Sequence, residues 1–467
     1  MRFPLAVAAA LAFALAGAPS HARDSTTTTQ IPPSGVMGVG AAQLTPQFWI
    51  GQLAHPDRVI MDTAAIAAEN ARLFQIDPSM HDLRKLPATL TRAQVEGWIT
   101  GLADAPDRPL FDADGKPVPQ ATLDAAVANR ALSAIPARQT TRYGLVVHRA
   151  ALRTFPTALR VFSSDDDADI DRFQESGMFP GTPVVIAHAS ADGRWLFVVS
   201  PRYAAWVEAR FVAEGSAQQV LGYVDRTPYR VVTGASVRTV FTPERPAVSQ
   251  LQLDMGTRVP LASGLAADQP VNGQAAYTSW TLDLPVRGAD GKLQLVPALL
   301  QKNTDTAADA LPLTRANIIR QAFKFLGERY GWGHSYDGRD CSGFVSDVYR
   351  SMGVQMPRNT SKQSISPALN RLHFTAADSH DARVKAALQL QVGDLVYIPG
   401  HVMMVIGKID GQPYVIHDTS GMSYLKPDGS MAHVKLNAVS VTPLLPLRAN
   451  RQQTYVDRMT NIVRIRP

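Results

Sequence analysis

The sequence is poor in cysteine: Cys341 is the only one in 467 residues. No disulfide can form within the chain, so its stability has to come from burial of side chains alone. The sequence also has no CxxC or HExxH motif, and one cysteine leaves too few ligands at a recognisable spacing for zinc. We therefore expect no metal and no cofactor.

Clustered positive charge and long apolar runs are scarce as well. The net charge of +6 is spread thinly, and no Lys/Arg run is interleaved with aromatic residues, so we expect no nucleic-acid partner. Beyond residues 1–22 no stretch is long and apolar enough to span a bilayer, and no cysteine lies near the N-terminus to carry a lipid. We expect no stable membrane anchor, and the sequence leaves the oligomeric state open.

Residues 1–22 have the pattern of an export signal. Arg2 precedes a short apolar run, from Phe3 to Leu15, and small residues follow it. The alternative is a buried N-terminal helix. We expect the protein to be exported, either to a periplasm or out of the cell.

The length and the composition, 45% hydrophobic and 18% charged, indicate a globular protein of several domains. Residues 23–41 are rich in Thr, Pro and Gly and are predicted to be a linker. Residues 42–128 are predicted to be a helical region, because residues 91–94 form a capping box ahead of apolar residues at helical spacing.

From about residue 129 the apolar period changes to two. Residues 180–186 are echoed by residues 255–261, and a strand that carries a tryptophan follows each copy, at Trp195 and Trp280. We predict two small β-barrels, residues 129–214 and residues 215–302. The segment from Asp192 to Trp195, with Tyr203 after it, resembles bacterial SH3-like domains, and the second copy resembles them less.

Residues 312–467 are predicted to form an α+β domain with a C-terminal extension. Thr314 has the chemistry to cap a first helix, and a loop rich in Gly, Tyr and Trp leads to Cys341 at the start of a second. Strands are expected at about 394–398, 401–407 and 413–418. The buried side of the second helix is predicted to consist of Phe344, Val345, Val348, Tyr349 and Met352.

Cys341 is predicted to be a nucleophile. Asp340 has N-cap chemistry, which places Cys341 in the first helical turn, where free N–H groups and the helix dipole favour an anion. A neighbouring imidazolium is expected to lower the pKa of the thiol further. The alternative is a buried hydrophobic cysteine.

His401 is predicted to be the base and His417 the residue that orients it. His401 begins an apolar strand and His417 ends the next one. A two-residue turn between the strands would put the two imidazoles on opposite faces. A three-residue loop from Ile409 to Gly411 would put them on the same face, within reach of each other, and we predict that geometry.

Five short motifs carry a family resemblance. They are residues 330–333, 340–344, 357–360 with Gln363, 393–395 and 400–402. They resemble the NlpC family of bacterial cell-wall cysteine peptidases, whose fold is a reduced papain-like one. The helical region and the SH3-like domains match a multidomain subgroup of that family, so the resemblance covers nearly the whole chain.

The resemblance implies a peptidase that hydrolyses peptidoglycan stem peptides between γ-D-glutamate and diaminopimelate or lysine. By the motifs, Cys341, His401 and His417 would be catalytic. The implied substrate-binding residues are Tyr330, Asp340, Ser342, Arg358, Asn359 and Tyr203. Tyr203 would belong to a wall, formed by the first SH3-like domain, that selects a free N-terminal L-alanine.

Two departures from the family and three alternatives remain. Asn359 replaces an acidic residue that binds the substrate amine in some relatives, and His334 replaces a glycine and is expected to reshape the edge of the cleft. The alternatives are an inactive wall-binding module, a thiol acyltransferase on the same fold, and a structural adaptor. The substrate, intact cell wall or released peptide, is left open.

Overall fold

The computed structural model describes residues 35–466, apart from residues 167, 267 and 427. The predicted export signal and most of the predicted linker lie outside the described residues. Within them, no helix is both long enough and apolar enough to cross a membrane.

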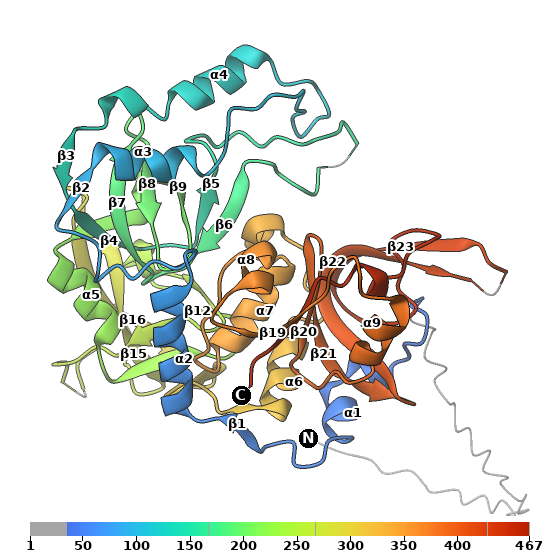
Figure 1. Ribbon diagram of the computed structural model, residues 1–467. Helices are drawn as coiled ribbons and strands as arrows, with labels where there is room; N and C mark the ends of the chain where they lie inside the picture. Colours follow the sequence, from blue (N-terminus) through green and yellow to red (C-terminus); the bar gives the residue numbers. More distant parts are fainter. Residues whose placement is uncertain (1–34, 167, 267, 427, 467) are drawn as a thin grey trace, which may run out of the picture. The chain divides into compact units, whose positions relative to one another are not determined.

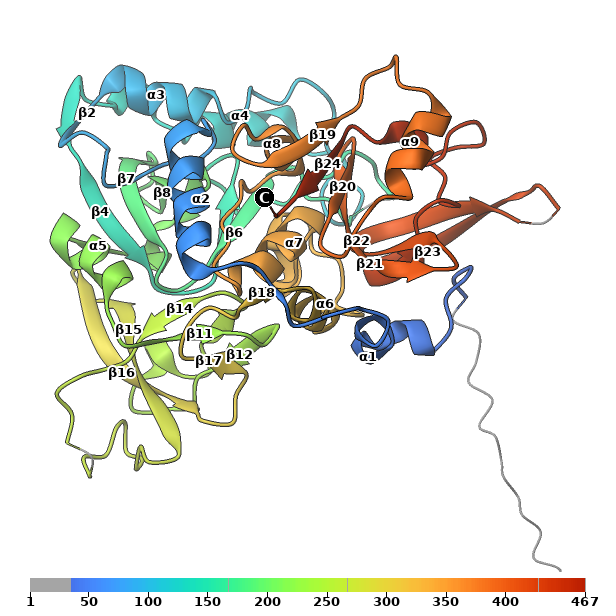
Figure 2. The same cartoon turned by 60° about the horizontal axis from the view of Figure 1, so that its bottom comes forward.

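The N-terminal region contacts the rest of the described chain at several places. Its elements are α1 (Pro46–Ile50), β1 (Val59–Met61), α2 (Thr63–Ile76), β2 (Thr89–Thr91), α3 (Arg92–Thr100) and α4 (Gln120–Ala128). The predicted capping box is present, because Thr91 and Gln94 each accept a hydrogen bond from the other's backbone N–H. Asn70 and Arg72 of α2 donate to the carbonyl oxygens of Gly353 and Ala368, so this helix lies against the C-terminal domain (Figures 1 and 2).

A seven-stranded antiparallel sheet follows, in the order β10-β4-β7-β8-β9-β5-β6. The strands of this part are β3 (Arg138–Thr140), which pairs with β2, and β4 (Arg142–Val146), β5 (Ala150–Arg153), β6 (Gln174–Met178), β7 (Pro183–Ala189), β8 (Trp195–Val199), β9 (Ala204–Glu208) and β10 (Val212–Gly215). Trp195, Phe197 and Trp206 are buried on one face, where α3 covers them with Val95 and Ile99. The sheet thus obtains part of its core from the N-terminal helices.

The next part begins with a helix that the sequence analysis missed, α5 (Ala217–Asp225). Ser216 and Gln219 form a capping box at its start. The strands that follow form a three-stranded sheet and two hairpins: β11 (Tyr229–Val232), β12 (Ser236–Arg238), β13 (Gln252–Asp254), β14 (Arg258–Pro260), β15 (Ser279–Arg287), β16 (Leu293–Gln301) and β17 (Thr306–Ala307). They enclose one apolar core, which includes Val232, Leu253 and Leu284.

The C-terminal domain has a six-stranded antiparallel sheet in the order β19-β24-β20-β21-β22-β23. Its elements are β18 (Leu313–Thr314), which pairs with β1, and α6 (Arg315–Phe323), α7 (Cys341–Arg350), α8 (Thr360–Ile365), β19 (Asn370–His373), α9 (His380–Ala387), β20 (Leu395–Ile398), β21 (His401–Ile409), β22 (Gln412–Leu425), β23 (Met431–Pro443) and β24 (Asn461–Arg464). Helices α6 and α7 cover one face of the sheet and α9 covers the other (Figure 1). The five residues predicted for the buried side of the second helix are fully buried.

The hairpin between β21 and β22 differs in detail from the prediction. Asp410 and Gly411, with φ of 49° and 79°, form a two-residue turn, and Ile409 pairs with Gln412. A pair of residues with positive φ is the common turn of a two-residue hairpin. The predicted three-residue loop is therefore wrong.

A β-bulge nevertheless produces the predicted register. Strand β21 has an extra residue, Ile406, between two positions that pair with consecutive residues of β22. Because side chains alternate along a strand, the extra residue reverses the parity that the short turn would impose. His401 and His417 therefore share one face of the sheet, as predicted, and their ring nitrogens lie 2.8 Å apart.

Candidate active site

The candidate nucleophile lies at the first turn of α7, as predicted. The Asp340 side chain caps the helix by accepting a 2.8 Å hydrogen bond from the Gly343 N–H. The N–H groups of Cys341 and Ser342 have no hydrogen-bond partner within the described part of the chain. Two free donors next to the sulfur are suited to stabilising an oxyanion.

The charge state of Cys341 is the opposite of the expected one. The side chain is 5% exposed, and burial raises the pKa of the thiol, as do the negative charges of Asp340 and Asp418. The Val402 amide N–H and Arg358 act in the other direction but do not offset burial. The resting cysteine is therefore a neutral thiol, and the expected lowering of its pKa is wrong because burial and the nearby carboxyl groups outweigh the groups that favour a thiolate.

His401 of β21 and His417 of β22 form a hydrogen-bonded pair of neutral imidazoles. His401 Nε2 lies 2.8 Å from His417 Nδ1, and His417 Nε2 lies 3.0 Å from the Thr442 hydroxyl. Burial lowers the pKa of His401 to about 4 and holds that of His417 well below its usual range. Among the described residues nothing hydrogen-bonds to His401 Nδ1. If His401 Nε2 donates to His417, that free nitrogen carries the lone pair that a general base needs.

A buried ion pair holds the start of α7. Arg358 donates from Nη2 to Asp340 Oδ2 at 2.8 Å and from Nη1 to the Ser342 hydroxyl at 2.8 Å. Its Nε donates to Ser176 of the SH3-like sheet at 2.7 Å. Burial alone would raise the pKa of Asp340, but Arg358 and the amide of the helix bring it below its usual range. The hydrogen-bonding groups of Asp340, Ser342 and Arg358 are thus engaged with one another beneath the thiol.

His334 lies in this buried network. It is 3% exposed, and its Nδ1 lies 2.8 Å from Arg358 Nη2. Its ring is packed so closely against Gly343 that a Cβ there would lie 2.6 Å from His334 Cε1. The ring packs against the arginine and the helix start, and His334 also lines a pocket of about 420 Å³ together with Ser335 and Tyr336, so its effect on the edge of the cleft stays a prediction.

Tyr203 meets the C-terminal domain at a small polar cluster. Its hydroxyl donates to Glu175 at 2.5 Å, and Asn359 donates to the same hydroxyl at 3.4 Å. Burial and the neighbouring Glu175 raise the pKa of Tyr203, which keeps the phenol neutral. Thr154 donates to the other carboxylate oxygen of Glu175 at 2.6 Å. The structure therefore brings Tyr203 and Asn359 together and adds a carboxylate that the sequence analysis missed.

Tyr330 lies close to the thiol. It is 9% exposed, and burial together with the negative charge of Asp340 raises the pKa of its phenol. Its hydroxyl makes no hydrogen bond with any described residue. The phenol is thus a free donor beside Cys341.

Asp418 is the second residue that the sequence analysis missed. It is fully buried, and neither carboxyl oxygen has a hydrogen-bond partner among the described residues. Burial raises its pKa strongly, and the nearby Asp340 and Glu328 raise it further. Its position directly after His417 was the only signal for it in the sequence.

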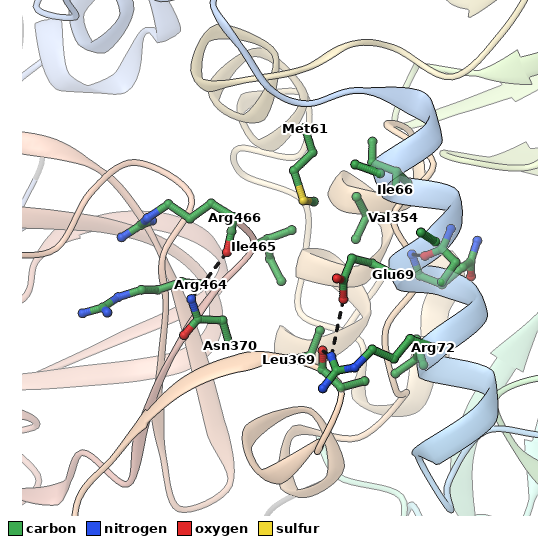
Figure 3. Close-up of a pocket in the computed structure, with 16 residues that line it drawn as sticks. Met61, Ile66, Glu69, Arg72, Val354, Leu369, Asn370, Arg464, Ile465 and Arg466 are labelled. Atoms are coloured by element: carbon green, nitrogen blue, oxygen red, sulfur yellow. Dashed lines mark hydrogen bonds and ion pairs between the residues drawn. The ribbon is translucent and has the colours of Figure 1, made fainter.

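One well-formed pocket in the described part of the chain does not contain these residues. It has a volume of about 480 Å³ and lies between α2 and the segment that ends with β24 (Figure 3). Its floor includes Ile66, Val354 and Ile465, and the ion pair of Glu69 with Arg72 lies at its side. Its lining contains no cysteine and no histidine, so the candidate chemistry belongs to the site at α7.

A thiol at a helix start, packed against an antiparallel sheet that carries paired imidazoles, defines a candidate cysteine hydrolase site. Residues 327–441 match the NlpC/P60 family, and residues 160–208 match an SH3 domain of the SH3b1 type. The chain therefore contains an NlpC/P60 domain together with an SH3b-type domain.

Two relatives extend the comparison. Over 203 residues the chain is 28% identical to a gamma-D-glutamyl-L-lysine dipeptidyl-peptidase of Bacillus cereus, an alignment that covers 40% of this chain and 50% of the relative. The chain thus spans about half the length of that curated relative. An NlpC/P60 endopeptidase from Photobacterium damselae subsp. piscicida superposes with a TM-score of 0.71 at 16% identity, over 89% of this chain and 96% of its own. The second comparison shows a common multidomain fold.

The raised pKa of Cys341 is testable by alkylation, because every label reports on this one thiol. We expect iodoacetamide to react with the folded protein at pH 7 at least roughly tenfold more slowly than with the urea-unfolded chain, since less thiolate is present. The rate should keep rising above pH 8.5 without a plateau. A fast plateau between pH 5 and 8 that disappears in His401→Gln would instead reveal a resting thiolate–imidazolium pair.

Asp418 should make the protein less stable as the pH rises. Its pKa is higher in the folded state than in the unfolded state, so the unfolded chain binds fewer protons and stability falls as the pH increases through that window. Asp418→Asn should match the wild-type Tm near pH 4.5 and exceed it increasingly up to pH 8.5, by roughly 2–4 °C for each kcal/mol removed. The exposed Asp107→Asn is the control. A difference in Tm that does not change with pH would contradict the assignment.

Proposed function

We propose that the protein is a cysteine peptidase that hydrolyses peptidoglycan stem peptides at the bond between γ-D-glutamate and a diamino acid. The observation that supports this most directly is Cys341 at the start of α7, packed against the sheet that carries the hydrogen-bonded pair of His401 and His417. The NlpC/P60 match and the relative that acts as a gamma-D-glutamyl-L-lysine dipeptidyl-peptidase support the same reaction class. The proposal includes export, which rests on residues 1–22.

The reaction starts from neutral groups. As the sulfur of Cys341 attacks the γ-carbonyl carbon, its proton passes to His401 Nδ1 and the carbonyl electron pair moves to the oxygen. The N–H groups of Cys341 and Ser342 are available to that oxyanion. The C–N bond then breaks as His401 returns the proton to the leaving amine.

Water completes the cycle. His401 removes a proton from water as the oxygen attacks the thioester; the C–S bond then breaks, His401 returns the proton to the sulfur, and the acid leaves as a carboxylate after losing its proton to solvent. His417 keeps the His401 ring in place through the 2.8 Å hydrogen bond, and Thr442 fixes His417 in turn. This order of events avoids a resting ion pair, whose charges would be costly in so buried a site.

Glu175 offers a carboxylate for the free N-terminal amine of the peptide. It is partly exposed and belongs to β6, and Tyr203 and Thr154 hold both of its oxygens. Asn359, at the position where some relatives have an acidic residue, donates to Tyr203 instead. We propose that the amine of an N-terminal L-alanine binds here, so the loss of the acidic residue at 359 does not abolish the requirement for it.

Mass spectrometry of digests of L-Ala-γ-D-Glu-diamino acid peptides tests the reaction. Wild type should release the L-Ala-γ-D-Glu dipeptide, and Cys341→Ala should reduce turnover to background while its Tm stays close to that of wild type, because alanine fits the same apolar site. Substantial hydrolysis by Cys341→Ala would refute the mechanism. A dipeptide-amine adduct formed in the presence of an added amine would identify acyl transfer.

The role of Glu175 is tested with free and N-acetylated peptides. Glu175→Gln should lower kcat/KM on the free peptide by about 10- to 100-fold, because a hydrogen bond to a charged group is lost. It should leave the slow hydrolysis of the acetylated peptide unchanged. Glu214→Gln, on β10, is the matched control. Equal hydrolysis of both peptides by wild type would exclude an amine site at Glu175.

A further inference from the structure

A second polar cavity lies between the SH3-like sheet and the C-terminal domain. Its volume is about 150 Å³, and three arginines line it: Arg202 from the loop between β8 and β9, Arg350 at the end of α7, and Arg358. No aspartate or glutamate lines it. A cavity whose charged lining residues are all cations is unusual inside a protein, because like charges repel when water is scarce.

Two of these cations have partners. Arg358 is paired with Asp340, and Arg350 lies 3.0 Å from Asp347. Arg350 also donates to the carbonyl oxygen of Met255, but its Nε is shielded from solvent and has no partner among the described residues. The guanidinium of Arg350 therefore keeps one unused donor.

The guanidinium of Arg202, unlike those of Arg350 and Arg358, has neither an ion-pair partner nor a hydrogen-bond partner among the described residues. It is only partly exposed, yet no ion pair and no hydrogen bond joins its guanidinium to any described residue. Burial and the repulsion of Arg350 and Arg358 lower its pKa to about 9, although Asp347 acts in the other direction. Because a guanidinium has an ordinary pKa above 12, this shift measures how poorly the cavity tolerates its charge.

The cavity also offers neutral donors. The side-chain amide of Gln355 makes no hydrogen bond within the described part of the chain, and the Thr182 hydroxyl only accepts one, from the Phe179 N–H at 3.4 Å. The Phe179 ring closes the wall next to Arg350, whose Cζ lies 4.7 Å from the ring centroid. Unused N–H and O–H donors around a cation that makes no ion pair match the coordination of an oxyanion.

We propose that this cavity binds one small oxyanion, held by Arg202 together with Arg350, Gln355 and Thr182. The volume suits a group the size of phosphate, sulfate or a carboxylate. The anion would join the loop of Arg202 to the end of α7. Since Tyr203 is the next residue in that loop, the bound anion would also stiffen the wall that carries Tyr203 and Glu175.

Thermal unfolding of the full chain tests the site without any assay of activity. At constant ionic strength, replacing chloride by phosphate or sulfate should raise the wild-type Tm along a saturating curve. Arg202→Gln should need at least about tenfold more anion for the same shift, and Arg202→Lys should keep part of the response. The exposed Arg194→Gln on the same sheet measures the general effect of these salts on stability.

A second arm asks whether the anion is free or belongs to the substrate, and this arm rests on the proposed function. Peptides with a free carboxylate are compared with the same peptides amidated at that group. If the substrate supplies the anion, wild type should show a lower KM for the acid form, and Arg202→Gln should lose that preference at unchanged kcat. If the anion is free, acid and amide should behave alike while phosphate still raises the Tm.

The outcomes separate the two proposals. Equal responses of wild type, Arg202→Gln and Arg194→Gln to phosphate and sulfate, together with no preference for the acid peptide that depends on Arg202, would overturn the anion site. A wild-type protein that cleaves no peptide would refute the proposed function, but the Tm titration would still decide whether the anion binds.

Discussion

The buried ion pair between Arg358 and Asp340 is the constraint on which the site depends. Asp340 caps α7, so its position sets where Cys341 and the two free N–H groups lie. Removing one partner of such a pair leaves an uncompensated buried charge and costs about 3–5 kcal/mol. Arg358 also donates to Ser176, so the same guanidinium that fixes the start of the helix joins the C-terminal domain to the SH3-like sheet.

The thiol of Cys341 differs from Asp340, its neighbour in sequence, in that it is neutral at rest. Here burial, Asp340 and Asp418 oppose the formation of a thiolate, and Arg358, which is paired with Asp340, does not offset them. Both imidazoles are desolvated and neutral as well. A site of neutral groups costs less to bury than an ion pair and develops charge only when a substrate carbonyl is present to accept it. The helix N–H groups then act on the charge that forms during the reaction and not on a resting anion.

The sequence predicted what local chemistry determines. The Asp340 cap, the capping box at Thr91 and the apolar face of α7 depend on neighbours within a few residues, and all three are present. The two histidines share a face of the sheet as predicted, although the predicted turn is wrong. The bulge at Ile406 restores their register, and it depends on tertiary packing: at the next residue, Gly407, a side chain would collide with the Trp49 ring of the N-terminal region. Glu175 and Asp418 were missed, and the thiol pKa was misjudged, because each depends on which distant segments exclude water from the site.

The seam between the domains explains why the SH3-like sheet is more than a tethered binding module. Arg149, between β4 and β5 of the SH3-like sheet, donates to the carbonyl oxygen of Gly338, and Arg339 donates to Asp254 and to the carbonyl oxygen of Ala235 in the β region that follows that sheet. Arg339 is 1% exposed and also binds Asp347 of α7. Through Arg149 and the hydrogen bond between Arg358 and Ser176, the SH3-like sheet is part of the framework that holds the helix of Cys341. An independent wall-binding module would need only a flexible linker. The buried arginine contacts between the SH3-like sheet and the C-terminal domain therefore favour a sheet that shapes the substrate site itself.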